Sequence, residues 1–151
     1  IAEGDYTVLY RKYGASWLNI MQDTEQEYGE HDWLMTRMSG DILVAGLGIG
    51  MIHIPLLDSE DVTSVTVVER EQDVIDLVWD DCAKDDRFTI VHADIHTWTP
   101  PAGSSWDVGW FDTWLTNDID ANDNIVSNQD YQTMIESKYG SMITEIGGWQ
   151  W

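Results

Sequence analysis

The residues best suited to bind a ligand lie between positions 41 and 71. An apolar run there ends in Gly46, Gly48 and Gly50, and a later β-branched run ends in Glu69. Glycine lets a ligand approach the backbone closely, because a Cβ at the same place would collide with it. The free N–H groups of a following helix attract a ligand's polar end, and a carboxylate at a strand tip can accept both hydroxyls of a ribose. The pattern therefore predicts a nucleotide site.

A strand, a glycine turn, a helix and a second strand must position these residues. We expect the first strand at 41–46, the helix at 50–57 and the second strand at 64–69. Pro55 is awkward inside that helix, so it either kinks the helix or marks an irregular start. Two such strands joined by a helix form half of a nucleotide-binding α/β unit, in which the strands run parallel.

The spacing of the glycines separates two kinds of nucleotide site. The dinucleotide fingerprint G-x-G-x-x-G would need glycine at position 51, where Met51 stands. The observed G-x-G-x-G spacing resembles the first motif of class I S-adenosylmethionine (SAM) methyltransferases. The phrase VTVVEREQDVIDL is similar to the second motif of that superfamily, and closest to its spermidine synthase-like branch, the polyamine aminopropyltransferases. The resemblance implies that SAM or decarboxylated SAM is the cofactor.

The N-terminal segment predicts a β-hairpin followed by a helix. Residues 5–21 contain alternating β-formers around a turn at 11–14, and Asp23 or Thr24 can cap the helix that follows.

Spermidine synthases carry a similar order of residues in this region, namely Gln-x-Thr, acids, a Tyr and a Glu. The matching positions of this chain, with shortened spacing, are Gln22, Thr24, Glu27, Tyr28 and Glu30. The resemblance implies that Gln22 binds the cofactor and that Tyr28 contacts the substrate. An ordinary capped helix is the alternative.

A carboxylate follows the third predicted strand. We expect a helix at 73–84 and a strand at 87–93 that leads into Asp94. In SAM enzymes the acid at this place accepts a hydrogen bond from the adenine amino group, so the resemblance implies that role for Asp94. His92 stands where the usual phrase has glycine. The residues next to the two acids, Arg70 and Ile95, are expected to line the cofactor as well.

The fourth predicted strand, at 106–111, leads into Asp112. This position resembles the superfamily's fourth motif, where the acceptor meets the cofactor's sulfonium, which implies that Asp112 is catalytic. It would orient the acceptor or take a proton from an amine nucleophile. Trp110 or Trp114 would lay a ring near the sulfonium, and Trp114 is also expected to contact the substrate. The second acid and the proline of the aminopropyltransferase phrase are missing here, so methyl and aminopropyl transfer both stay open.

The rest of the chain adds a helix and a strand. A polar loop at 115–128 precedes a helix that starts at Ser127 and ends at Gly140, and a fifth strand is expected at 141–146. Class I domains have seven strands, so the resemblance implies a C-terminally truncated sheet.

Together these elements predict an α/β fold. We expect a Rossmann-like, mostly parallel sheet with flanking helices, preceded by an N-terminal β-hairpin and shortened at the C-terminus. The chain would form one domain, 1–151, with the hairpin and first helix at 1–40 and the nucleotide-binding core at 41–151.

The chain is strongly acidic, with 28 Asp and Glu against 7 Lys and Arg and a formal net charge of −21. Nucleic-acid affinity comes largely from cations that neutralise phosphates, so a nucleic-acid partner is not expected. Two interpretations of the charge remain open. One is adaptation to high salt, where screening removes self-repulsion. The other is attraction of a cationic acceptor such as a polyamine.

The single cysteine, Cys82, excludes an internal disulfide and favours a reducing compartment, the cytoplasm. Cys82 is expected to pack in the core and His53 to be packed or exposed. No metal site is expected, because His53 has no partner at metal-ligand spacing. A membrane partner is not expected either, since no apolar run approaches the roughly 20 residues of a membrane span and no signal peptide is visible.

Two functions from different classes fit these features. The first is a transferase that moves a methyl or aminopropyl group from SAM or decarboxylated SAM to a small or cationic acceptor by in-line displacement. The alternative is a non-catalytic SAM-fold protein with a structural or assembly role, in a virion or its host's cytoplasm. A truncated sheet would leave an unpaired edge strand, which favours association into a homo-oligomer.

Overall fold

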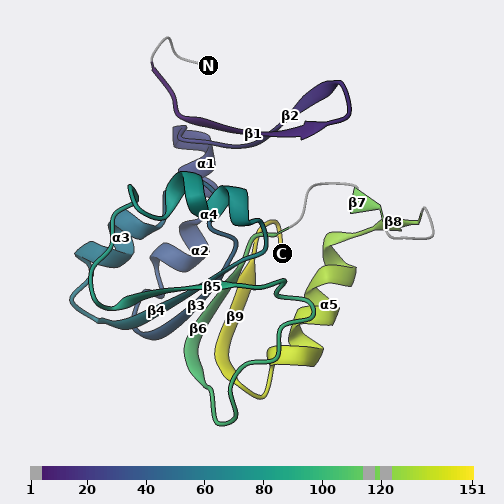
Figure 1. Cartoon of the computed structure of the whole chain (residues 1–151). Helices are drawn as coiled ribbons and strands as arrows, with labels where there is room; N and C mark the ends of the chain where they lie inside the picture. The colour runs from purple at the N-terminus through teal and green to yellow at the C-terminus, as the bar shows by residue number, and fades with distance from the viewer. Residues whose placement is uncertain (1–4, 114–117, 120–123) are drawn as a thin grey trace.

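A five-stranded parallel sheet forms the centre of the computed structural model (Figure 1), which describes residues 5–113, 118–119 and 124–151. The strand order is β5-β4-β3-β6-β9, and every neighbouring pair is parallel. The strands are β3 (Gly40–Ala45), β4 (Val62–Glu69), β5 (Phe88–His92), β6 (Trp106–Phe111) and β9 (Ile143–Gly148). The predicted Rossmann-like, mostly parallel sheet is therefore confirmed.

The central strands are largely apolar because both faces of the sheet are covered. In β3, residues 42–45 are all fully buried, and in β4 the same holds for Val65, Val67 and Val68. Parallel sheets packed on both sides have this continuous apolar character, whereas a half-solvated strand alternates. The sequence therefore placed both strands within two residues of their observed bounds.

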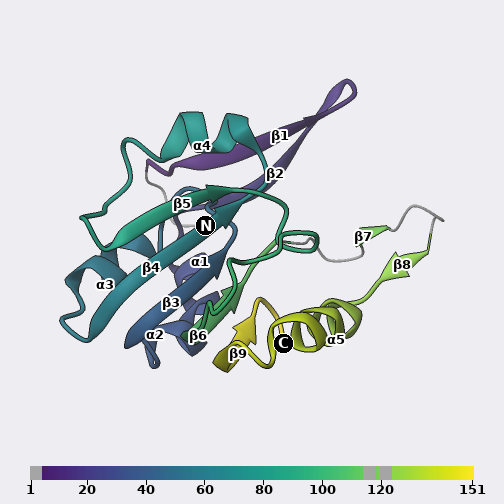
Figure 2. The same ribbon diagram turned by 60° about the horizontal axis from the view of Figure 1, so that its bottom comes forward.

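Helices cover the two faces of the sheet unequally (Figure 2). On one face, Leu34 of α2 (Asp32–Met35) and Leu56 of α3 (His53–Asp58) join the core with the apolar side of α4 (Gln72–Val78). On the other face, Ile135 and Tyr139 of α5 (Asn128–Tyr139) pack against residues of β3 and β6. Ser127 and Asp130 form a capping box at the start of α5, as the sequence predicts.

The predicted N-terminal hairpin is also present and lies above the carboxyl ends of the strands (Figure 1). Strands β1 (Val8–Tyr13) and β2 (Ser16–Gln22) pair antiparallel, so the turn falls after Tyr13 rather than at 11–14. Helix α1 (Glu25–Glu30) follows. Of the two predicted caps, Thr24 is the one used, since its Oγ1 accepts a hydrogen bond from the Glu27 N–H at 3.3 Å.

Three predicted boundaries were wrong. The helix expected at 73–84 ends at Val78, and the Lys84 ammonium donates to the carbonyls of Trp79 and Asp80 that the next turn would have needed. The helix expected at 50–57 begins only at His53, so Pro55 lies in its first turn, where its missing N–H costs no hydrogen bond. The last strand occupies 143–148 rather than 141–146.

The predicted loop at 115–128 contains two short strands, β7 (Asp118–Ile119) and β8 (Ile125–Val126), which pair antiparallel. Five strands form the main sheet within the described residues, and the expected truncation of a seven-stranded sheet stays a prediction. Among the described helices, none combines the length and the apolar character that crossing a membrane requires.

We expect Leu43→Ala to lower the free energy of unfolding by about 2–5 kcal/mol, because it opens a cavity in the central strand. Leu43 is 0% exposed. Urea denaturation followed by circular dichroism measures the change. Leu77→Ala is the matched control: Leu77 is 68% exposed on α4, so its loss should stay within about 0.5 kcal/mol. Equal losses of unfolding free energy in the two variants would contradict the central, buried position of Leu43.

Candidate functional site

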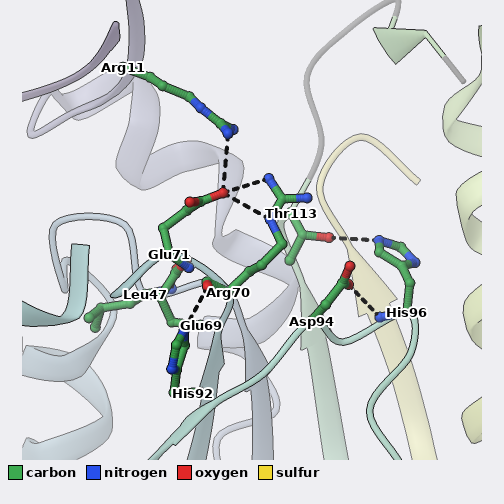
Figure 3. Close-up of polar contacts among 9 residues, drawn as sticks. All are labelled: Arg11, Leu47, Glu69, Arg70, Glu71, His92, Asp94, His96 and Thr113. Atoms are coloured by element: carbon green, nitrogen blue, oxygen red, sulfur yellow. Dashed lines mark hydrogen bonds and ion pairs between the residues drawn. The ribbon is translucent and has the colours of Figure 1, made fainter. Parts of the chain in front are cut away.

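Three acidic residues stand at the carboxyl edge of the parallel sheet. Glu69 is the last residue of β4, Asp94 follows β5 and Asp112 follows β6. Figure 3 shows the first two of these with the residues around them. In open α/β sheets ligands bind in the crevice outside the carboxyl ends of the strands, so this edge is where a site is expected.

The Glu69 carboxylate points at the glycine turn that follows β3. Its Oε2 accepts a hydrogen bond from the Leu47 N–H at 2.9 Å, and its Oε1 accepts one from the Glu71 N–H at 2.8 Å (Figure 3). The residue is 9% exposed. Each carboxylate oxygen has two lone pairs, so Glu69 can accept further hydrogen bonds from ligand hydroxyls.

Two of the three glycines make room for protein atoms as well as for a ligand. A Cβ on Gly46 would overlap the carbonyl oxygen of Asp112, and a Cβ on Gly50 would lie 2.7 Å from the Cβ of Cys82. Gly46 also has a φ of +99°, which side-chain-bearing residues rarely adopt. The turn is therefore packed tightly against the ends of neighbouring elements.

Met21 of the hairpin covers the third glycine, and sequence reasoning missed it. A Cβ on Gly48 would overlap the Met21 sulfur, and the Ile49 N–H donates to that sulfur at 3.4 Å. A thioether is a weak acceptor, so this contact holds the hairpin only lightly. The expected cradle is consequently occupied in part by the chain's own side chain.

An ion pair joins the hairpin to the same edge. Arg11 of β1 lies 3.2 Å from Glu71, which also pairs with the Arg70 guanidinium at 2.9 Å (Figure 3). The side chains of Arg11 and Glu71 are 49% and 41% exposed, so this contact contributes little free energy. Arg70, expected to line the cofactor, is exposed beside the site, and its carbonyl accepts from His92 Nε2 at 3.0 Å.

Asp94 stabilises the turn after β5, and Ile95 ties that turn to α5. Asp94 Oδ1 accepts from the His96 N–H at 2.9 Å (Figure 3), and the Ile95 carbonyl accepts from the Tyr139 hydroxyl at 2.6 Å. Burial, followed by the nearby charge of Asp94, raises the pKa of Tyr139 to about 12. The Ile95 side chain is 3% exposed in the core, so its observed contacts anchor the fold.

A buried histidine lies beside Asp112, and sequence reasoning missed it too. His31 is 2% exposed, and its Nδ1–H donates to the Glu27 carbonyl at 2.8 Å. Nε2 is then directed at Asp112, 3.6 Å from its Oδ2. Burial lowers the pKa of His31, but the hydrogen bond to Asp112 and its charge, helped by Glu27, outweigh burial and raise it. The acid-rich run EYGEHDW was the available signal, since it surrounds this histidine with carboxylates.

Negatively charged side chains surround the His31–Asp112 pair. The pKa of Glu27 is raised by burial first and then by the negative charges of Glu30 and Asp112, while His31 acts in the opposite direction. The carboxylates of Glu27 and Glu30 on α1 and of Asp112 after β6 therefore interact, and a cation close to them would be stabilised.

The other predicted residues lie outside this group. Gln22 accepts a hydrogen bond from the Asn19 amide at 3.3 Å, Tyr28 is 39% exposed, and Trp114 lies outside the described residues. Two cavities in the described part of the chain are not lined by Glu69. One lies beside the carboxyl ends of β6 and β9, and the other at the opposite edge of the sheet.

The strand order, together with a glycine turn held by the Glu69 carboxylate, defines a Rossmann-like fold. Solved structures of methyltransferases share this fold. N-methyltransferase NodS from Bradyrhizobium japonicum WM9 superposes with a TM-score of 0.55 at 15% identity, covering 80% of this chain and 65% of NodS. NodS in complex with S-adenosyl-L-homocysteine (SAH) gives a TM-score of 0.57 at 16% identity, covering 80% of this chain and 58% of NodS.

The methyltransferase domain of bacterial CtHen1-C gives a TM-score of 0.52 at 11% identity, over 76% of this chain and 82% of that domain. These identities show the fold alone, and this chain spans about two thirds or less of the NodS chains. No protein-family model matches the sequence, and no curated protein matches it significantly.

We expect Asp112→Asn to cost more stability near pH 6 than near pH 9. The folded-state pKa of His31 is raised, so protonated His31 stabilises the fold. That contribution is full below the unfolded pKa of about 6.5 and is lost as pH rises through the folded pKa. The substitution removes the charge that raises the pKa. Urea unfolding of both proteins across this pH range measures the difference.

Asp58→Asn is the control, because Asp58 is exposed at the end of α3, away from this pair. Its effect on the free energy of unfolding should not change between pH 6 and 9. A pH-independent effect of Asp112→Asn would show that His31 and Asp112 are not coupled.

Proposed function

We propose that this protein binds SAM at the carboxyl edge of β3, β4 and β5 and transfers its methyl group to a small or cationic acceptor. The observation that carries the proposal is the Glu69 carboxylate, held by the N–H groups of Leu47 and Glu71 directly beneath the glycine turn. The fold shared with NodS, whose structure contains SAH, supports the same location.

The residues present fit the adenosine part of the cofactor. Glu69 keeps acceptor capacity for two ribose hydroxyls, and Asp94 is suitably placed after β5 to accept from the adenine amino group. The methionine part fits only if Met21 moves, because the Met21 sulfur covers Gly48. Binding therefore requires the hairpin to shift, and its light attachment through Met21 and Arg11 allows that.

Asp112 and His31 would handle the acceptor. SAM supplies an electrophilic methyl carbon on a sulfonium, so the chain's own task is to align the acceptor with it. Asp112 lies where β6 meets the glycine turn, and it can orient an acceptor or take a proton from an amine. His31, fixed by the Glu27 carbonyl, keeps this carboxylate oriented.

One observation favours a second candidate, a non-catalytic SAM-fold protein with a structural role. Met21 fills the space over Gly48 that a ligand would need. A hairpin that never moves would leave the sheet without a ligand site. The sequence resemblance also allows aminopropyl transfer from decarboxylated SAM. Comparing the affinities of the protein for SAM and for decarboxylated SAM distinguishes this reaction from methyl transfer.

We expect SAM and SAH to bind the wild-type protein, and Glu69→Ala to weaken both by roughly 10- to 150-fold. Hydrogen bonds to a charged acceptor contribute about 1.5–3 kcal/mol, and the substitution removes them. Isothermal titration calorimetry with SAM, SAH and decarboxylated SAM measures the affinities. Glu60→Gln is the control, because Glu60 is exposed before β4 and should leave binding unchanged.

Absence of binding by all three compounds at millimolar concentration would refute the proposed function. Tighter binding of decarboxylated SAM than of SAM would replace methyl transfer by aminopropyl transfer. Thermal melting of Glu69→Ala distinguishes a lost ligand contact from a collapsed glycine turn.

We also expect Met21→Ala to strengthen SAM binding several-fold. A competent state that is only partly populated reduces the apparent affinity by its fraction, and removing the sulfur from Gly48 raises that fraction. The same calorimetric titration measures the change. Met134→Ala is the control, since Met134 is 50% exposed on α5. Unchanged or weaker binding by Met21→Ala would show that Met21 does not compete with the cofactor.

A further inference from the structure

We propose that the cavity beside the carboxyl ends of β6 and β9 binds a small amino alcohol, meaning an ammonium group and a hydroxyl on one short carbon chain. As the acceptor class of the transferase, this inference rests on the proposed function. As a binding site, it stands on the cavity alone.

The cavity has the size and walls of a small-ligand site. Its volume is about 450 Å³, within the usual range for such sites. Trp33, Trp110 and Trp151 line it, together with Glu30 and the amide of Gln132. These residues come from α1, α2, β6, α5 and the C-terminal end of the described chain, so the fold brings distant segments together here.

Two glycines at the end of β9 hold the indole rings in place. A Cβ on Gly147 would overlap the Trp33 ring, and a Cβ on Gly148 would overlap the Trp151 ring. The rings therefore lie directly on the strand backbone, and any larger residue at either glycine would push a wall out of position.

The charge at the cavity selects for a cation. Glu30 lines it and accepts a hydrogen bond from the Trp149 indole N–H. Burial raises the pKa of Glu27, and the nearby charges of Glu30 and Asp112 raise it further. The chain carries a net charge of −21 in addition. An ammonium group gains from each of these charges.

The tryptophans add to this preference, because the face of an indole ring attracts cations. Trp33 already shows the effect: the Arg37 guanidinium lies over its ring, 4.5 Å from the centroid. Arg37 takes that face, so a ligand cation depends on Glu30 and on the other rings.

A buried donor specifies the second group of the ligand. Trp110 is 1% exposed, and its Nε1–H has no hydrogen-bond partner among the described residues. A buried donor left unpaired is costly, so a ligand that presents an acceptor oxygen is favoured once a small shift of the cavity wall opens a path to this N–H. A hydroxyl oxygen accepts this bond, whereas a second ammonium group has no lone pair to offer.

The cavity also adjoins the residues assigned to catalysis. Trp110 lies two residues before Asp112 on β6, and its ring contacts that of His31 at a centroid distance of 5.6 Å. Asp112 touches the glycine turn on its other side. The cavity therefore lies close in the fold to Asp112, which borders the proposed cofactor site.

Three matched probes test charge and hydroxyl separately. N,N-dimethylethanolamine carries both groups, 3-methylbutan-1-ol replaces the ammonium with carbon, and N,N-dimethylpropylamine lacks the hydroxyl. We expect the first to bind at least about fivefold more tightly than either of the others, and to shift the Trp110 indole signal in two-dimensional NMR. Comparison with Trp110→Phe assigns that signal.

Two variants locate the interactions. Glu30→Gln should weaken N,N-dimethylethanolamine about fivefold or more, while Glu25→Gln, on the exposed side of the same helix, should not. Trp110→Phe keeps an aromatic ring and removes the N–H, so it should abolish the preference for the hydroxyl compound over N,N-dimethylpropylamine.

The proposal would be overturned if N,N-dimethylethanolamine bound no more tightly than 3-methylbutan-1-ol or N,N-dimethylpropylamine. Equal losses in Glu30→Gln and Glu25→Gln, or the absence of saturable binding, would also overturn it. A parallel SAH titration separates the two proposals. SAH binding without amine binding rejects only the cavity, and amine binding without SAH binding rejects only the transferase.

Discussion

The candidate site depends on one buried carboxylate that bridges two strands. Glu69 accepts hydrogen bonds from the N–H groups of Leu47 and Glu71. The turn after β3 and the turn after β4 are therefore fixed to a single side chain. A turn with glycines at 46, 48 and 50 has high conformational freedom when unfolded, and it needs such an anchor to hold one conformation. The same contact keeps the carboxylate at the carboxyl edge of the sheet. The fold therefore depends on the same carboxylate that the proposed cofactor would contact.

Around that anchor, the protein divides its carboxyl edge into two parts of different character. The glycine turn, Glu69 and Asp94 lie beneath the hairpin, which is attached by a thioether contact and a half-exposed ion pair. The tryptophan-lined cavity lies beside β6 and β9, next to Glu30. Asp112 stands between them with His31 behind it. The net charge of −21 adds to the charge of Glu30 at this cavity.

Sequence reasoning was most accurate where local pattern and tertiary demand agree. The apolar runs of β3, β4 and β6 gave the sheet, and the acids near their carboxyl ends gave its edge, because burial on both faces keeps strands largely apolar. Residues from other elements were out of reach. Met21 over Gly48 and His31 beside Asp112 are contacts between segments remote in sequence, and nothing in their own neighbourhoods specifies the partner. Glycine spacing likewise could not distinguish ligand approach from close packing, as Gly46 and Gly50 show.

The order of strands also governs how the chain can assemble. The central strand β3 pairs with β4 on one side and with β6 on the other, so that Ile42 meets both Val65 and Val108. The pairing of β3 with β6 closes a long loop that contains β4 and β5. The chain loses the entropy of that loop closure before the new contacts stabilise it. Parallel sheets of this kind fold slowly for their size. Until β6 has been synthesised, one edge of the most apolar strand stays open, and this interval is when the nascent protein is most exposed to aggregation.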